Sequence, residues 1–332
     1  MFDSKSPLLF RPYADVDFLK WCLSFYIHSS NKNVNENTGL MSGLLEWSKK
    51  LYLELEYEKI IPSIRKNGIV MYSNTKHGLD EEIQLAKKAK RLEIDTTVLT
   101  NKDISDLNPG VNFNGLGGVH YTGDMHTDPA SLMTSMKSFL KEQGVSFIYS
   151  KAERFTTDID RIKTISAGAN EYEVDAMIIC TGMACREITS LFGSNLFIQG
   201  GKGYNVTISN VSPQLTTPMI LVEGRVALTP MGTSLRIGGT MEIGKPNNTV
   251  NKNRIDGILT NTESFLPDYK KSELEKIKPW YGYRPLSANG MPIIKRLEQY
   301  KNVFINTGHG MLGLSLAPAS GMIMKEIVAS SI

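Results

Sequence analysis

The sequence predicts a mixed α/β (α+β) chain of two domains, and three observations lead to that prediction. Residues 176–180 form an unbroken apolar run, which is typical of a strand buried on both faces of a sheet. From residue 196 onward, short β-type segments alternate with Pro, Gly and Ser/Thr turns, which is the pattern of an antiparallel sheet. Residues 302–314 have the order strand, glycine-rich turn, helix start.

The composition fits two domains and argues against a nucleic-acid partner. A chain of 332 residues, 41% hydrophobic and 21% charged, is long enough for two medium-sized domains with buried cores. Its 37 basic and 34 acidic residues give a net charge of only +3, and no basic block stands out. We therefore expect small molecules as partners.

Cysteine and histidine usage predicts neither disulfides nor a metal site. There are 3 cysteines, an odd number without a C-x-x-C pair, which suits a reducing cytoplasm. His28, His77, His120 and His126 lack the spacing of metal ligands. No apolar run approaches the length of a membrane span, and the N-terminus lacks the order of a signal peptide. We expect a cytoplasmic protein, with peripheral attachment to the inner face of the membrane left open.

Two helices are predicted near the start of the chain. Asp15 is a suitable cap for the first, which is rich in aromatic residues. A polar loop at residues 31–38 precedes the second, whose apolar stripe repeats at steps of three and four and comprises Leu40, Leu44, Trp47, Leu51 and Leu55. We expect the two helices to pack together.

The remaining elements follow from hydrophobic period and turn residues. Further strands are expected at residues 68–72, 96–99, 117–121, 145–149, 152–156, 161–166 and 172–180, with helices at 80–91 and 128–143. The antiparallel sheet is assigned to residues 202–204, 219–222, 225–229 and 235–241, followed by a helix at 251–265. A last helix is expected over residues 316–329.

The glycine-rich turn near the end of the chain predicts a ligand site. Gly308, Gly310 and Gly313 satisfy G-x-G-x-x-G, but that fingerprint requires a βαβ unit of roughly 30 residues, and the printed sequence stops at Ile332. We interpret the turn instead as bare backbone beside a helix N-terminus, where a flat or anionic ligand could lie. An ordinary strand-to-helix loop is the alternative.

Several motifs occur in one order along the chain. They are Gly282-Tyr283-Arg284-Pro285, Asn289-Gly290-Met291-Pro292, Asn306-Thr307-Gly308-His309-Gly310 and Ala317-Pro318-Ala319-Ser320-Gly321. The set resembles the carboxy-terminal signature of the FAD-dependent D-amino-acid oxidase/dehydrogenase superfamily, and most closely its bacterial D-amino-acid dehydrogenases.

The resemblance implies a particular domain plan. It predicts a FAD/NAD(P)-binding-like domain missing its first βαβ unit, over residues 117–195 and 279–332, and an antiparallel-sheet substrate domain over residues 1–116 and 196–278. The superfamily's opening strand, G-x-G-x-x-G turn and helix are expected to be absent. A truncated or mis-started gene product, or a second chain that supplies the segment, would explain this.

The resemblance also implies an activity: oxidation of an amino acid, typically a D-amino acid, to an imino acid and then a 2-oxo acid, with hydride passing to FAD and electrons on to a quinone or oxygen. Arg284 matches the carboxylate-binding arginine, and a guanidinium forms two parallel bonds with a carboxylate. Pairing with an acidic neighbour is its alternative. Tyr204 is a candidate substrate-side hydroxyl, with cross-strand packing as the alternative.

The cofactor-binding residues implied by the resemblance act mainly through their backbones. Ala152 matches the position that meets adenine, and Thr181 and Gly182 end the second cofactor-binding strand. The flavin side is assigned to Gly308, His309, Gly310, Met311, Leu312, Gly313 and Leu314, with the backbone of His309 rather than its ring as the contact.

Two other functions stay open at this stage. Glycine/sarcosine-type and hydroxyproline-type amine oxidoreductases share the G-x-R-P motif. The other class is a truncated, non-catalytic fragment that does not bind FAD.

Overall fold

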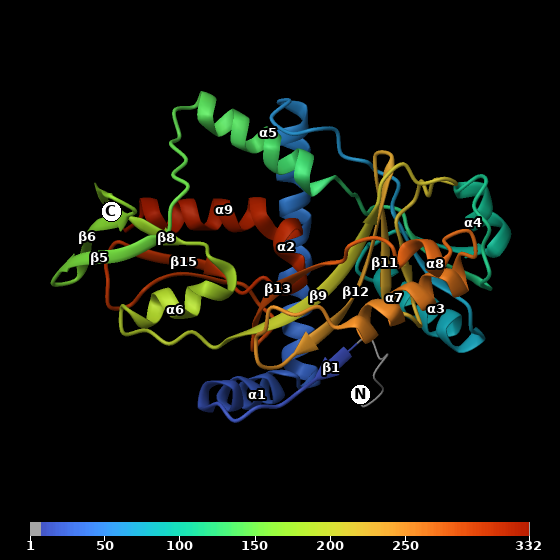
Figure 1. The fold of residues 1–332 in the computed structure, drawn as a ribbon, viewed down its shortest axis with the longest axis horizontal. Coiled ribbons are helices and arrows are strands. Elements are labelled where there is room, and N and C mark those ends of the chain that lie inside the picture. Colours follow the sequence, from blue (N-terminus) through green and yellow to red (C-terminus); the bar gives the residue numbers. More distant parts are fainter. Residues whose placement is uncertain (1–7, 332) are drawn as a thin grey trace. The chain divides into compact units, whose positions relative to one another are not determined.

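The computed structural model describes residues 8–331, which pack into two units. Unit 1 comprises residues 62–132 and 202–282 with the described residues before 13, and unit 2 comprises residues 13–61, 133–201 and 283–331. Figure 1 labels their elements. These packing boundaries differ from the predicted domains at residues 13–61, 117–132, 196–201 and 279–282. Which unit carries which function stays a prediction.

Unit 1 is built on a mixed, largely antiparallel sheet. The strand order is β13-β9-β12-β11-β10-β2-β4-β3, and β1 pairs with β12. The strands are β1 (Leu8–Phe10), β2 (Ile69–Ser73), β3 (Thr96–Thr100), β4 (Gly117–Tyr121), β9 (Ile198–Ile208), β10 (Met219–Leu221), β11 (Val226–Met231), β12 (Ser234–Ile243) and β13 (Trp280–Ser287). Strands β9 and β13 each carry residues of both units.

Helices cover the sheet of unit 1 and close its core. Helices α3 (Lys76–Lys90) and α4 (Asn101–Leu107) pack on β3 and β4, and α7 (Lys252–Phe265), followed by α8 (Lys271–Leu274), packs on β10, β11 and β12. Tyr72 from β2 and Phe265 from α7 meet edge to face at 5.6 Å between ring centroids. Both side chains are at most 1% exposed, so this contact lies at the centre of the core.

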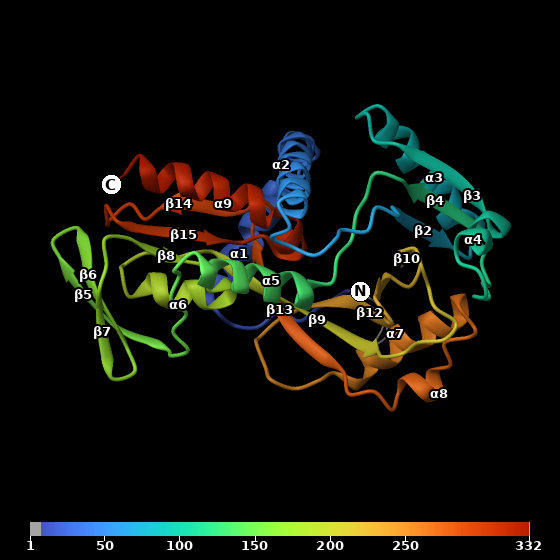
Figure 2. The same ribbon diagram turned by 90° about the horizontal axis from the view of Figure 1, so that it is seen from above.

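Unit 2 contains two small sheets, which Figure 2 shows as separate layers. One has the order β14 (Ile293–Arg296), β15 (Val303–Thr307), β8 (Met177–Ile179), and the other the order β5 (Ala152–Asp158), β6 (Arg161–Ala167), β7 (Asn170–Glu173). β8 and β15 are parallel. The helices are α1 (Val16–His28), α2 (Asn31–Tyr57), α6 (Cys185–Ser190), α9 (Gly313–Ala329) and the part of α5 (Pro129–Glu142) beyond residue 132.

Helix α2 packs chiefly along α9, whereas the sequence predicted that it packs on α1. Its start at Asn31 also corrects the predicted polar loop at residues 31–38, because the Ser30 hydroxyl accepts a bond from the Asn33 N–H and caps the helix. The contact with α9 has a specific polar component. Pro318 has no N–H to donate to the Leu314 carbonyl, and the Tyr52 hydroxyl donates to that oxygen at 2.7 Å.

Two strand predictions in unit 2 are wrong. Residues 145–149 have no strand partner among the described residues, and their side chains are exposed, up to 78% for Tyr149. An apolar β-type sequence without a neighbouring strand has no ladder to join. The predicted strand 172–180 divides into β7, which pairs with β6, and β8, which pairs with β15.

One helical stretch in the described residues, Gly310–Ala329, has the length and apolar composition that a membrane span requires. The sequence pattern predicted none. In unit 2 this stretch packs against α2, β14 and β15.

Candidate functional site

The carboxyl ends of β8 and β15 lie side by side. Parallel strands end at the same edge of a sheet, where ligands bind in open α/β folds. The loops after the two strands are tied together, because the Thr307 hydroxyl donates to the Gly182 carbonyl at 3.1 Å. Thr181 is exposed beside this bond. The structure therefore brings the predicted Thr181-Gly182 turn next to the predicted glycine turn.

Left-handed glycines shape both loops. Gly182, Gly308 and Gly310 have φ angles of +58°, +78° and +56°, which residues with a side chain rarely adopt. A Cβ at Gly308 would approach Ile293 Cγ1 to 3.2 Å, whereas nothing lies within 4 Å of a Cβ at Gly182. The backbone at Gly182 thus faces open space, as contact with a flat ligand requires.

The ring of His309 is held by the helix that follows the turn. Its Nε2 lies 2.9 Å from the Ser320 hydroxyl of α9, and burial lowers the pKa of His309 below its usual value. A neutral ring bonded to Ser320 orients the turn. This agrees with a ligand contact through the His309 backbone and not with the ring acting as a catalytic base.

The N-terminus of α9 is open to a ligand. A 3-10 turn, Gly310–Leu312, leads into the helix, and Leu312 at the cap position has no side-chain oxygen to accept from the first N–H groups. Met311 and Leu314 are 70% and 40% exposed. The Leu312 N–H donates to the His309 carbonyl at 3.0 Å, so the other amides at the start of the helix and the positive end of its dipole are the groups that suit negative charge.

Arg284 lies in β13, close in sequence to a contact with the glycine turn. Leu286 forms an isolated antiparallel bridge with His309, and a Cβ at Gly310 would lie 3.5 Å from Leu286 Cδ2. Side chains alternate along a strand, so Arg284 and Leu286 point to the same face of β13, about 7 Å apart. Trp21 fixes this segment by donating from Nε1 to the Leu286 carbonyl at 3.0 Å.

Tyr204 lies in unit 1 and its hydroxyl already has a partner. The side chain is 2% exposed, and the hydroxyl donates to Glu242 Oε2 at 2.7 Å. Its ring lies 6.4 Å from that of Tyr281 in β13. These contacts favour packing between strands over direct contact with a substrate.

Ala152 is the first residue of β5 and is exposed. It lies in a different sheet of unit 2 from β8 and β15.

Three supporting residues were not identified from the sequence. Trp21, Leu286 and Ile293 hold the turn through a hydrogen bond, a strand bridge and packing. Leu286 could have been found, because it directly follows the G-x-R-P motif. Trp21 could not, since nothing in the sequence links residue 21 to residue 286.

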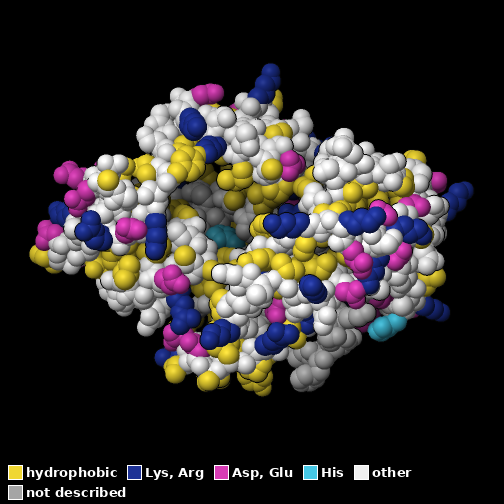
Figure 3. Space-filling view, viewed as in Figure 1, with side chains coloured by type: hydrophobic (Ala, Val, Ile, Leu, Met, Phe, Trp, Pro, Cys, Tyr) yellow, Lys and Arg dark blue, Asp and Glu magenta, His cyan; other side chains and the backbone are white. Residues whose placement is uncertain are grey.

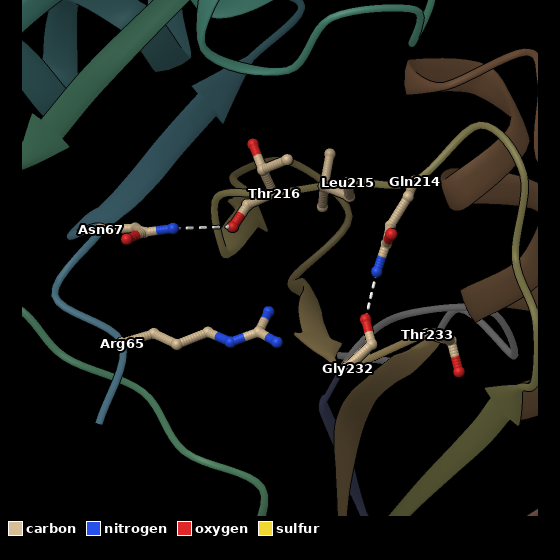
Figure 4. A pocket seen from close by; sticks show the side chains of 7 residues that line it. All are labelled: Arg65, Asn67, Gln214, Leu215, Thr216, Gly232 and Thr233. Carbon is tan, nitrogen blue, oxygen red and sulfur yellow. Dashed lines mark hydrogen bonds between the residues drawn. The ribbon is translucent and has the colours of Figure 1, made fainter. Parts of the chain in front are cut away.

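A pocket of about 570 Å³ lies in unit 1 and contains none of the predicted site residues. It is lined by Arg65, Asn67, Gln214, Leu215, Thr216, Gly232 and Thr233 (Figure 4). Two of its amide side chains already donate to backbone carbonyls, Asn67 to Thr216 and Gln214 to Gly232.

Charges on the face drawn in Figure 3 are interspersed, with no large patch of one sign. Within the described residues, no group of three or more His, Cys, Asp and Glu side chains could hold a metal ion.

The glycine turns fit one side of a flavin. They provide bare backbone at Gly182, left-handed turns at Gly308 and Gly310, and an uncapped helix N-terminus. An edge of this kind is where open α/β folds bind dinucleotides. Residues 21–327 match the family described as FAD dependent oxidoreductase (DAO), and the chain belongs to that family.

Relatives support the assignment over most of the chain. A D-amino acid dehydrogenase of Helicobacter pylori is 23% identical over 331 residues, covering 98% of this chain and 78% of the relative. D-amino acid dehydrogenase 3 of Mesorhizobium japonicum is 25% identical over 342 residues, covering 100% and 82%. The predicted superfamily is confirmed, and this chain is a FAD-dependent oxidoreductase by family.

The solved structures agree on the fold. Glycine oxidase from Geobacillus kaustophilus superposes with a TM-score of 0.74 at 19% identity, covering 89% of this chain and 79% of that one. The predicted mixed α/β fold is confirmed. The absence of a first βαβ unit stays a prediction, as does the role of each site residue.

Proposed function

We propose that this chain oxidises a D-amino acid to its imino acid, with FAD as hydride acceptor, as the names of its relatives suggest. One observation carries the proposal. The strand that bears Arg284 is bridged, at Leu286, to the His309 backbone of the left-handed glycine turn. The proposed carboxylate-binding arginine and the proposed flavin-side turn belong to one unit, which supports the proposal.

The residues of the chain would divide the work between them. Arg284 would hold the substrate carboxylate through two parallel bonds and so fix the direction of the Cα–H bond. The amides of residues 311–314 other than that of Leu312, which bonds to the His309 carbonyl, would stabilise negative charge on the pyrimidine edge of the ring. Bound flavin supplies the chemistry itself, by accepting a hydride from the α-carbon.

FAD binding by this chain is part of the proposal. The glycine turns would supply contacts for the ring side, and the backbone of Ala152 is the proposed contact for adenine. A second chain that supplies a phosphate-binding segment is the proposed partner if the purified protein lacks flavin. We place the activity in the cytoplasm, with peripheral attachment at the inner face of the membrane, and propose a quinone or oxygen as electron acceptor.

The absorbance spectrum of the purified protein, before and after addition of FAD, tests the cofactor. Flavin bands that stay with the protein through gel filtration support the proposal. Their absence under both conditions contradicts FAD binding by this chain alone, and repeating the measurement with a lysate of the source cells tests for the partner chain.

Substrate and acceptor are tested with the flavin-loaded protein. Reduction of an artificial dye by D-alanine but not L-alanine, without oxygen uptake, is the expected outcome for a dehydrogenase. Oxygen uptake with glycine or sarcosine would favour the other amine oxidoreductases. No turnover of any amino acid by flavin-loaded protein contradicts the proposed activity.

A further inference from the structure

The side chain of Lys202 is buried in unit 1. The residue is 1% exposed and lies on β9, two positions before Tyr204. A lysine ammonium loses strong hydration when it is buried, so a position like this costs free energy unless several acceptors surround the charge. Burial accordingly lowers the pKa of Lys202.

The ammonium is held by one loop, residues 245–250, between β12 and α7. Nζ donates to the Asn247 carbonyl at 2.9 Å, to Asn247 Oδ1 at 2.8 Å and to the Thr249 carbonyl at 2.5 Å. An ammonium has three N–H donors, and these three acceptors match them. Because two are backbone carbonyls, the lysine fixes the path of the loop itself.

The same ammonium lies against β13. Nζ is 4.1 Å from the centroid of the Tyr281 ring, a cation–π distance, and the Tyr281 hydroxyl donates to the Asn248 carbonyl at 3.0 Å. Lys202 and Tyr281 therefore bond to consecutive residues of the loop, Lys202 to residues 247 and 249 and Tyr281 to residue 248. Tyr281 lies three residues before Arg284 in the same strand.

Close packing continues along these two strands. In unit 2, a Cβ at Gly200 would come within 2.8 Å of the Tyr283 ring, so β9 has room only for glycine there. Since alternate residues of a strand share a face, Gly200, Lys202 and Tyr204 form one row on β9 and Tyr281 and Tyr283 one row on β13. Within β13, Arg284 belongs to the opposite row. Any effect of Lys202 on the position of Arg284 therefore passes through the backbone of β13.

Glu242 and Arg11 are the other charged groups of this cluster. Glu242, 7% exposed, accepts from Tyr204 and lies 3.6 Å from Arg11 Nη1. The negative charge of Glu242 partly offsets the effect of burial on the pKa of Lys202. The three hydrogen bonds described above go to the loop.

We propose that Lys202 is a positioning residue, whose ammonium joins the 245–250 loop to the Tyr281 face of β13 and so fixes the strand that presents Arg284 to the substrate carboxylate. The role that this inference gives to Arg284 rests on the proposed function. The connection that Lys202 makes between the 245–250 loop and β13 does not depend on the proposed function.

Lys202→Met and Lys202→Arg test the inference in the full, flavin-loaded chain, with Lys245→Met as a matched control. Lys245 is exposed and lies on the same loop. The first readout is amide hydrogen exchange of residues 247–250 and 280–286, expected to be about tenfold faster in Lys202→Met and unchanged in the control. Lys202→Arg, which keeps the charge, is expected to restore part of the protection.

The second readout is the kinetics with D-alanine. Misplacement of a carboxylate-binding residue is expected to raise KM roughly fivefold in Lys202→Met while kcat changes less than about twofold. Unchanged exchange in both segments overturns the proposed joining, and a fall in kcat with unchanged KM overturns the link to Arg284. Absence of turnover in the unmodified protein would instead contradict the proposed function, while the exchange experiment still decides the joining.

If Lys202→Met does not fold, Asn247→Ala provides the same test. It removes one of the three acceptors and leaves both backbone carbonyls in place, and it also removes the bonds that Asn247 Oδ1 accepts from the Thr249 N–H and hydroxyl. Faster exchange in residues 280–286 is expected, because the altered loop is bonded to Lys202 and Tyr281, which contact each other at β13. Faster exchange confined to residues 247–250 would contradict the inference.

Discussion

At the scale of single residues, the proposed chemistry depends on where one guanidinium lies. Arg284 is half-buried in β13 and lies two residues before Leu286, which meets the His309 backbone. A partly buried arginine loses less of its bonding strength to water than an exposed one. Its contribution to substrate binding should therefore be measurable.

Arg284→Leu is expected to lower kcat/KM for the amino acid by roughly 10² to 10⁴, because two charge-assisted bonds are worth about 1.5 to 3 kcal/mol each. Circular dichroism should show an intact fold. Arg296→Leu, at an exposed arginine of β14 in the same unit, is the control and should leave kcat/KM unchanged. A loss under about tenfold for Arg284→Leu contradicts the assignment.

Tyr52→Phe removes the hydroxyl that bonds to the Leu314 carbonyl, and burial already raises the pKa of Tyr52 to about 12. We expect the free energy of unfolding to fall by about 1 kcal/mol, because Pro318 leaves that carbonyl without a helical donor. Urea denaturation measures the change. Tyr57→Phe, on the same helix at an 88% exposed residue, should change it by less than about 0.5 kcal/mol.

At the scale of elements, the glycine turn joins β15 to α9 through two left-handed residues. Gly308 is confined by Ile293 as well as by its φ angle, whereas Gly310 has room for a methyl group and only its φ of +56° opposes one. A substitution at Gly310 therefore tests the conformational constraint alone, whereas a substitution at Gly308 tests the steric and conformational constraints together.

Gly310→Ala is expected to cost about 1 to 2 kcal/mol of stability from backbone strain alone and to weaken flavin retention. Gly321→Ala is the matched control, because Gly321 is helical in α9 and nothing lies within 4 Å of its Cβ. That change should stabilise the helix by roughly 0.5 to 1 kcal/mol. Equal effects of the two substitutions would show that the left-handed turn has no energetic role.

The sequence predicted this strand, turn and helix because local chemistry determines them: an apolar run, glycines and a helical period occur in order. Four short motifs also indicated the family. It did not predict that α2 packs on α9, because the stripe from Leu40 to Leu55 shows which face is apolar but not its partner. The prediction of a strand at residues 145–149 failed for the same reason, because a strand requires a neighbouring strand that the local sequence does not specify.

The candidate site divides along the same line. Thr181, Gly182 and the residues of the glycine turn were predicted from motifs and do come together. The bond from Tyr204 to Glu242 and the three bonds of Lys202 join residues about 40 positions apart. Neither could be predicted, because a lysine in a K-G-Y motif reads equally well as exposed.

At the scale of the whole molecule, buried histidines predict how stability depends on pH. Burial lowers the pKa of His309 in unit 2 and of His126 in unit 1, where the charge of Arg65 adds to the effect. The unfolded chain, with a histidine pKa of about 6.5, binds these protons first as the pH falls. Each residue therefore favours folding fully above pH of about 6.5 and less as the pH falls toward the lowered value.

We expect the melting temperature to fall between pH 7.5 and pH 5, and to fall less steeply in His309→Gln, which can still bond to Ser320. Glu82, whose pKa burial raises, acts in the opposite sense, so the difference between the two proteins isolates the histidine. Thermal melts across this range measure it. Identical slopes would show that His309 titrates alike in both states.

The proline in α9 makes the start of that helix sensitive to substitutions in α2. Pro318 leaves the first turn of that helix one internal bond short, and a hydroxyl from α2 takes its place. Helix α2 thus helps to hold the first turn of α9, whose amides lie nearest the proposed flavin. Substitutions that shift α2 along its axis should alter the colour and redox potential of a bound flavin before they alter its affinity.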